Sequence, residues 1–220
     1  MKYASQLLFD IDKAKKAWYN FSITLIFYLK KDDFMELKSK TVLFLGSSVT
    51  YGSASGGISF ADLMQKELGF NMIKEAVSGT TLADISEKSY VSRLKKVDAE
   101  CVDLFICQLS TNDASKKLDY ADTENAIRFI IEYVREKFAC PVVFYTGTRY
   151  ESERYAYLVE MLYRLKDEYG FYVLDLWNDE EMLAVTPQDY ERFMKDKIHP
   201  NIVGYTEWWT PKFVSFCTSL

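Results

Sequence analysis

The sequence is poor in the residues that build metal sites and disulfide frameworks. It contains one histidine and four cysteines, with no Cys-x-x-Cys pair. A structural zinc site draws its four ligands mostly from these two residue types, so the composition argues against one. The cysteines lie in or beside apolar segments and are predicted to be reduced core residues of a cytoplasmic protein: Cys101, Cys107, Cys140 and Cys217.

Long hydrophobic runs and basic runs are also missing. The net charge is −5, and no basic stretch alternates with aromatic residues, which argues against a nucleic-acid partner. The longest apolar stretch, residues 21–29, is far too short to cross a bilayer. The first ten residues lack the apolar core and cleavage site of a signal peptide. These absences predict a cytoplasmic protein without a membrane span.

What the sequence does contain is a regular alternation of strand-like and helix-like segments after residue 38. The chain has 220 residues, 49% of them hydrophobic, which is enough for one packed domain over 39–220. Apolar runs predict five strands, at 41–45, 72–77, 102–109, 142–146 and 171–176. Strands that alternate with helices predict a parallel sheet covered on both faces.

Capping signals predict where the intervening helices begin. Ser59 with Asp62, and Thr81 with Asp84, have the spacing of capping boxes. Two further helices are predicted from apolar faces at helical spacing: Ile127, Ile130, Ile131, Val134 and Phe138, then Tyr155, Leu158, Met161, Leu162 and Leu165. The final segment, 201–220, is predicted to be a helix interrupted near Pro211.

Residues 1–38 are predicted to be an appendage to this domain. Residues 4–18 have a helical apolar face, and 21–29 are ambiguous between helix and strand. This is too much apolar surface to leave in water. We therefore expect the appendage to pack on the domain or on a second subunit, which would make a homo-oligomer.

The first predicted strand leads to a candidate nucleophile. Residues 41–45 end in a Gly-Ser-Ser turn at 46–48. Open α/β sheets hold their chemistry at the carboxyl ends of such strands, which makes Ser48 the candidate. A P-loop would need Gly and Lys where Tyr51 and Gly52 stand, and a dinucleotide fingerprint would need Gly at Ser48. An ordinary turn of small residues stays open as the alternative.

The single histidine, His199, stands three residues after Asp196 in a predicted loop. That spacing lets the carboxylate reach the imidazole, fix its tautomer and stabilise its charged form. The alternative is a surface histidine beside a turn-forming aspartate. The parallel topology, however, brings this pair to the same sheet edge as the turns that carry Ser48, Gly79 and Asn112.

Taken together, these turns resemble the four sequence blocks of the SGNH, or GDSL-type, hydrolase family over about residues 41–205. Residues 46–49 are similar to the first block, Gly-Asp-Ser-Leu, with Ser48 at the nucleophile. Gly79 and Asn112 match the second- and third-block residues that bind the oxyanion. The last block, Asp-x-x-His, is matched by Asp196 and His199. The sequence departs from the pattern at Ser47, where the family has Asp, and at Ser110, where it has Gly.

The resemblance implies a flavodoxin-like three-layer α/β/α sandwich with a five-stranded parallel sheet. It also implies a serine esterase that hydrolyses a small-molecule ester through a Ser-His-Asp triad, with an oxyanion hole formed by Ser48, Gly79 and Asn112. No metal or organic cofactor is required. The alternatives are a lysophospholipase or thioesterase-type lipolytic enzyme, an acyltransferase on the same triad, and a non-catalytic domain that binds a ligand in the cleft.

Three aromatic or charged residues near the strand ends are predicted to bind substrate. Tyr51, Arg149 and Tyr150 would supply hydrogen-bonding and stacking groups to the cleft. The loops around them are polar and small, which favours acetyl-like esters, such as those of carbohydrates, over long acyl chains. Because the chain is rich in aromatics, packing alone is the alternative role for the two tyrosines.

Overall fold

The structure, a computed structural model, describes residues 35–83 and 85–220. The predicted N-terminal helix over 4–18 and the apolar stretch 21–29 lie outside these residues. The chain divides into two units, and the larger one is Leu37–Phe216.

A parallel sheet of five strands forms its centre, as predicted. The strands are β1 (Thr41–Gly46), β2 (Asn71–Ala76), β3 (Leu104–Gln108), β4 (Val142–Tyr145) and β5 (Tyr172–Leu174). Their spatial order is β2-β1-β3-β4-β5, the flavodoxin-like order. The chain crosses over β1 between β2 and β3, so β2 lies on one side of β1 and β3, β4 and β5 lie on the other. All five carboxyl ends therefore lie at one edge of the sheet.

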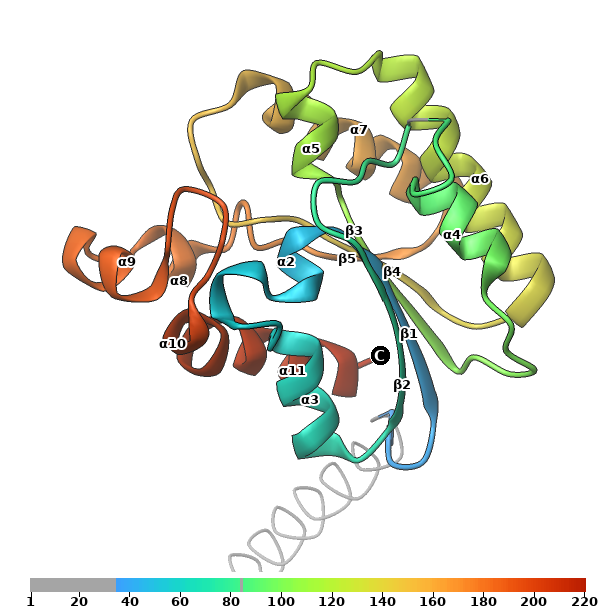
Figure 1. Cartoon of the computed structure of the whole chain (residues 1–220), viewed down its shortest axis with the longest axis horizontal. Helices are drawn as coiled ribbons and strands as arrows, with labels where there is room; N and C mark the ends of the chain where they lie inside the picture. The colour runs from blue at the N-terminus through green and yellow to red at the C-terminus, as the bar shows by residue number, and fades with distance from the viewer. Residues whose placement is uncertain (1–34, 84) are drawn as a thin grey trace, which may run out of the picture. The chain divides into compact units, whose positions relative to one another are not determined.

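Three helices cover one face of the sheet: the short α4 (Tyr90–Lys96) and the long α6 (Tyr120–Phe138) and α7 (Glu153–Tyr169) (Figure 1). Alternate strand residues, among them Leu43, Phe105 and Phe144, pack against them in one apolar cluster. The predicted inner faces of α6 and α7 are confirmed, since nearly all of their named residues are buried. This burial, more than intrinsic helix propensity, stabilises the helices.

The opposite face carries an aromatic layer. Phe44 and Tyr145 point to this side and pack against Phe60, which begins α3 (Phe60–Leu68). Phe213 of α11 (Thr210–Thr218) stacks on Phe60 with ring centroids 3.8 Å apart. Helices thus lie on both sides of the sheet (Figure 1), and the predicted three-layer sandwich is confirmed.

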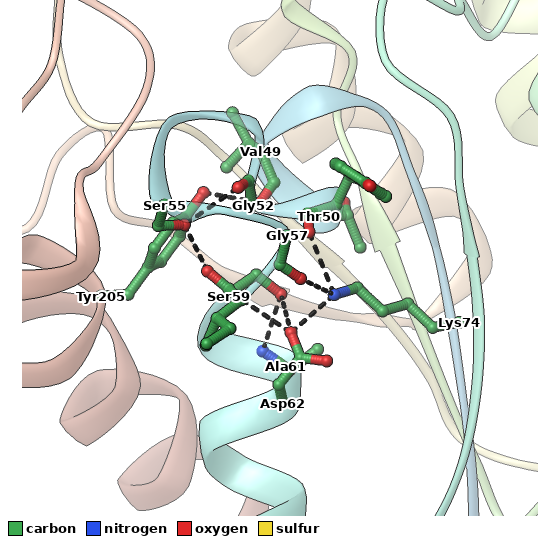
Figure 2. Close-up of polar contacts among 12 residues, drawn as sticks. Val49, Thr50, Gly52, Ser55, Gly57, Ser59, Ala61, Asp62, Lys74 and Tyr205 are labelled. Atoms are coloured by element: carbon green, nitrogen blue, oxygen red, sulfur yellow. Dashed lines mark hydrogen bonds and ion pairs between the residues drawn. The ribbon is translucent and has the colours of Figure 1, made fainter.

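One predicted capping box is confirmed and the other is wrong. The Asp62 carboxylate accepts the Ser59 N–H at 2.7 Å at the start of α3 (Figure 2). Residue 81 begins no helix, because α4 starts at Tyr90 with Ser89 as its N-cap. The backbone N–H groups that follow residue 81 donate instead to a distant carboxylate, that of Asp113. A tertiary partner has replaced the local cap.

Several short helices were not predicted: α2 (Ser48–Tyr51), η1 (Ser53–Ser55), α5 (Thr111–Ser115), α8 (Glu180–Leu183) and α9 (Pro187–Phe193). The predicted terminal helical segment, 201–220, begins with a further short helix, α10 (Ile202–Gly204). The predicted interruption near Pro211 is confirmed as the π-helical turn η2 (Tyr205–Trp209), which precedes α11. Proline has no N–H to donate, so the helix changes its hydrogen-bond pattern just before it.

The cysteine prediction is partly wrong. Cys107, Cys140 and Cys217 are buried free thiols, and burial raises the pKa of Cys140 to about 11. Cys101 is exposed, because β3 begins only at Leu104 and the residues before it lie outside the sheet. Across the described ranges, no helix is both long and apolar enough to cross a membrane.

Candidate active site

Three of the predicted residues form one hydrogen-bonded line at the carboxyl edge of the sheet. Ser48 Oγ lies 2.7 Å from His199 Nε2, although 151 positions separate the two residues. On the other side of the ring, His199 Nδ1 lies 2.8 Å from Asp196 Oδ2. The structure therefore brings a hydroxyl, an imidazole and a carboxylate together in the order that proton transfer requires.

The carboxylate determines which nitrogen of the imidazole carries the proton. An ionised carboxylate only accepts hydrogen bonds, so the Nδ1 atom of His199 must be the donor to Asp196. In the neutral ring this leaves Nε2 as an acceptor. The Ser48 hydroxyl then donates to Nε2, which is the arrangement that prepares a serine for attack.

Local hydrogen bonds hold Asp196 in place. Its Oδ1 atom accepts the backbone N–H groups of Ile198 and His199, each at 2.8 Å. Burial raises the pKa of Asp196, but these two N–H groups and the imidazole lower it more, so the net effect is a pKa below the usual value. Asp196 is thus ionised throughout the range in which an imidazole titrates.

Ser48 stands at the start of α2, directly after β1, and is 8% exposed. The turn before it needs glycine, because a Cβ on Gly46 would lie 1.7 Å from the Thr50 hydroxyl. Gln108 Oε1 accepts the Ser47 N–H and the Thr50 hydroxyl, both at 2.9 Å. Buried side chains of other elements therefore determine where the Ser48 hydroxyl lies.

Hydrogen bonds from other elements also hold α2 and the loop that follows it in place. Lys74 of β2 donates to the Gly57 carbonyl at 3.3 Å and to Asp62 at 2.6 Å (Figure 2). The Tyr205 hydroxyl donates to the Val49 carbonyl at 2.7 Å from the opposite side.

The two predicted oxyanion donors besides Ser48 lie on neighbouring segments, Gly79 in the turn after β2 and Asn112 on α5. Gly79 has φ +78°, a left-handed conformation that favours glycine. The Asn112 amide nitrogen donates to the Thr80 carbonyl at 2.8 Å, which ties α5 to the turn of Gly79. An amide nitrogen carries two hydrogens, so one of them is left for a ligand.

The predicted substrate-binding residues divide between two sides of the sheet edge. Tyr51 is 47% exposed at the end of α2, with its ring beside Lys74 of β2. Arg149 donates to the Trp177 carbonyl at 3.2 Å, and Tyr150 packs on Trp177 and Tyr155. Tyr150 is thus largely a packing residue, and burial raises its pKa to about 12. Tyr51 and Arg149 keep polar surface that a ligand could contact.

A cavity of about 390 Å³ opens beside the loop of Asp196 and His199. Its walls combine apolar side chains with Arg149, Thr148, Tyr190 and Glu191; the apolar ones are Leu176, Met182, Leu183, Val185, Pro187 and Trp208. The Tyr190 hydroxyl donates to the Lys197 carbonyl, which connects this wall to the loop of Asp196 and His199. Within the part of the chain that the structure describes, no group of three His, Cys, Asp or Glu residues could hold a metal ion.

Sequence reasoning missed the buried polar residues that support the site. Arg93, Gln108 and Asp113 are all at least 90% buried. Nothing in their sequence neighbourhoods marks them: Gln108 is the last residue of β3, Asp113 lies in the first turn of α5, and Arg93 lies among other polar residues in the middle of α4. The two residues that depart from the family pattern both make hydrogen bonds. The Ser47 N–H donates to the Gln108 side chain, and the Ser110 hydroxyl caps α5 by accepting the Asp113 N–H.

Comparison with known proteins agrees with the fold and the predicted family. The crystal structure of a protein from Lactobacillus plantarum has a TM-score of 0.71 at 18% identity, over 81% of this chain and 96% of that one. A lipolytic G-D-S-L family protein from Veillonella parvula has a TM-score of 0.67 at 16% identity, over 82% of this chain and 100% of that one. An acetyl xylan esterase has a TM-score of 0.64 at 18% identity, over 80% of this chain and 98% of that one.

A search of curated proteins found no significant match. The sequence model of the GDSL-like lipase/acylhydrolase family, in contrast, matches residues 44–206, nearly three quarters of the chain. This match includes all four blocks that carried the resemblance. The chain belongs to the GDSL-like lipase/acylhydrolase family of ester-hydrolysing enzymes.

Proposed function

We propose that this enzyme is a serine esterase in which Ser48 is the nucleophile, His199 the general base and Asp196 the residue that orients it. One observation carries the proposal: the continuous line from Ser48 Oγ through the imidazole to the Asp196 carboxylate, with contacts of 2.7 and 2.8 Å. Both distances lie within the reach of direct proton transfer.

The first half of the reaction forms an acyl-enzyme. As Ser48 Oγ attacks the ester carbonyl carbon, its proton moves to His199 Nε2 and the carbonyl oxygen becomes an oxyanion. We assign the hydrogen bonds to that oxyanion to the N–H groups of Ser48 and Gly79 and to the free hydrogen of the Asn112 amide. A preorganised donor of this kind is typically worth about 3 kcal/mol of barrier.

The second half releases both products. The negative charge of Asp196 stabilises the imidazolium of His199. The imidazolium protonates the leaving alcohol as the tetrahedral intermediate collapses. Water then attacks the acyl carbon and gives a proton to His199, which passes it to Ser48 Oγ as the bond between that oxygen and the acyl carbon breaks, and the carboxylic acid leaves. Every proton passes through the imidazole, so the chain's own residues suffice for the reaction.

For the substrate we propose short, acetyl-like acyl groups, with carbohydrate as one class of alcohol. The loops at the strand ends are polar, and Tyr51 offers an exposed ring for stacking. The fold is also that of a protein named as an acetyl xylan esterase. The apolar cavity beside Tyr190 favours a second candidate, a lipolytic esterase for longer acyl chains, since its volume exceeds what an acetyl group needs.

The test has two parts. A fluorophosphonate probe should label Ser48, located by peptide mass spectrometry, in the wild type and in Ser47→Ala but not in Ser48→Ala. Values of kcat/KM for acetyl, butyryl, octanoyl and palmitoyl p-nitrophenyl esters then separate the two substrate candidates. A maximum at acetyl or butyryl supports the short-acyl proposal, and a maximum at octanoyl or longer overturns it.

Two remaining alternatives are decided with the same protein. An unlabelled wild type without esterase activity would indicate a non-catalytic ligand-binding domain. Transfer of the acyl group to an added acceptor alcohol, in preference to water, would indicate an acyltransferase.

A further inference from the structure

A guanidinium group is buried behind the candidate active site. Arg93 lies on α4, and its side chain is 7% exposed. Taking a charge out of water is costly unless other groups compensate it. The carboxylate of Glu75 is 3.9 Å from Arg93 Nη1 and is itself 38% exposed, so this ion pair compensates only part of the charge.

The remaining compensation comes from uncharged oxygen atoms on four segments, one of them the stretch just before α4 itself. Arg93 Nη2 donates to the Gly46 carbonyl at 2.8 Å and to the Thr80 hydroxyl at 3.2 Å. Nη1 donates to the Glu75 carbonyl, and Nε donates to the Lys88 carbonyl at 3.0 Å. One side chain therefore joins the end of β1, the end of β2 and the turn after β2.

Two of these segments carry the proposed catalytic groups. Gly46 stands two residues before Ser48, and Thr80 is next to Gly79. The Thr80 carbonyl accepts the Asn112 amide at 2.8 Å, so this turn also determines where Asn112 lies. A single nitrogen atom, Arg93 Nη2, thus spans the turn of the nucleophile and the turn of the oxyanion donors.

The same turn is held from its other end by a buried carboxylate. Asp113 accepts the N–H groups of Leu82 and Ala83 at 2.9 and 3.0 Å. Asp113 stands directly after Asn112 on α5, so it links the turn to the Asn112 side of the site. Arg93 links the turn to the Ser48 side through the Gly46 carbonyl. Two other contacts join the same segments: the Val77 N–H donates to the same carbonyl, and the Ser53 and Ser78 hydroxyls are hydrogen-bonded to each other.

We propose that Arg93 is a positioning residue for catalysis. It holds the turn of Gly79, to which the Asn112 amide is hydrogen-bonded, at a fixed distance from the turn of Ser48, so that the oxyanion donors converge on one point. This inference rests on the proposed function. Donors of an oxyanion hole must be held within about 0.5 Å of their productive positions. Lysine could replace the charge of Arg93. It could not replace the planar guanidinium, whose nitrogen atoms donate hydrogen bonds to both turns at once.

The experiment compares Arg93→Lys and Arg93→Ala with the wild type and with Arg135→Lys. Arg135 is a suitable control because its guanidinium also donates to a backbone carbonyl, that of Tyr169, but at the ends of α6 and α7. Steady-state kinetics on the best p-nitrophenyl ester give kcat and KM separately, and thermal melting reports folding. Turnover of Arg93→Ala is also measured with added guanidinium ion, well below denaturing concentrations.

We expect Arg93→Lys to lower kcat by about 10- to 100-fold, with KM little changed, because oxyanion donors act on the transition state. Arg135→Lys should keep the kinetics of the wild type. Guanidinium ion should restore part of the kcat of Arg93→Ala, which a purely structural contact would not explain. If Arg93→Ala does not fold, Arg93→Lys decides alone.

An unchanged kcat in folded Arg93→Lys, while Ser48→Ala is inactive, would overturn the assignment of Arg93 and leave the proposed function in place. A Ser48→Ala variant as active as the wild type would overturn both. A loss that appears in KM rather than kcat would also reject the positioning role.

Discussion

The two halves of the candidate triad are held in different ways. Ser48 is 8% exposed, in a turn fixed by residues from β3, α4 and η2. The side chains of His199 and Asp196 are 25% and 55% exposed, in a loop closed by its own backbone. Lys195 N–H donates to the His199 carbonyl at 2.8 Å, and Met194 pairs with Pro200 in an isolated bridge.

The difference shows what each half depends on. Local hydrogen bonds organise the loop of His199, so a short piece of sequence contains most of what is needed to shape it. The turn of Ser48 depends on distant, buried donors and acceptors, whose loss leaves unsatisfied groups in a dry environment. We therefore expect changes in the loop to affect chemistry with little loss of stability, and changes behind Ser48 to affect both.

The largest effect should come from the two residues of the loop. His199→Gln removes the only histidine and should lower kcat by about 10⁶-fold, while Asp196→Asn should lower it by about 10⁴-fold, because an orienting residue contributes less than the base. Melting temperatures of both variants should stay close to that of the wild type. Near-normal turnover by His199→Gln would refute its role as the base.

The pH dependence should also come from the loop. The pKa of Asp196 is lowered, so this carboxylate stays charged until strongly acidic pH, and its contribution to stability is lost only there. Loss of activity at less acidic pH should therefore not come from Asp196. A general base accepts a proton only in its unprotonated form, so we expect kcat/KM to rise with pH. A profile without this rising limb would contradict the assignment.

Behind Ser48, the clearest effect on stability should come from Gln108. Gln108→Leu leaves the Ser47 N–H without its acceptor and the Thr50 hydroxyl with only the Tyr145 hydroxyl as partner, and should lower the free energy of unfolding by about 1–3 kcal/mol. Gln65→Leu is the matched control, since its amide makes one half-exposed contact of 3.4 Å to a backbone carbonyl. Equal losses in the two variants by denaturant unfolding would contradict the comparison.

The smallest effect on stability should come from removing a single tyrosine hydroxyl. Two such hydroxyls donate to backbone carbonyls, one beside Ser48 and one in the loop of His199. The buried Tyr205 hydroxyl is 2.7 Å from the Val49 carbonyl, and the exposed Tyr190 hydroxyl is 3.3 Å from the Lys197 carbonyl. Tyr205→Phe should cost about 1–2 kcal/mol of stability, and Tyr190→Phe under about 0.5 kcal/mol. The reverse order in thermal melts would show that the loop is not the more local half.

The confirmed predictions all depend on patterns within a few residues. Apolar runs identified the five strands, the spacing of Ser59 and Asp62 identified one helix start, and Pro211 marked the interruption of the last helix. The wrong ones failed where a distant group competed with a local signal. Asp113 takes the N–H groups that would have begun a helix near residue 81, and Cys101 lies before the strand that was expected to bury it.

By itself, the sequence of this protein determined the alternation of strands and helices, the parallel sheet and the order of the four family blocks, because these follow from periodicity and from turn residues. Only the tertiary structure decided that the Ser48 hydroxyl meets the imidazole of His199, since 151 positions separate them and the meeting depends on how β1 and the last loop are placed. It also decided the roles of Arg93, Gln108 and Asp113. A buried polar side chain acquires its meaning from the partners that folding brings to it.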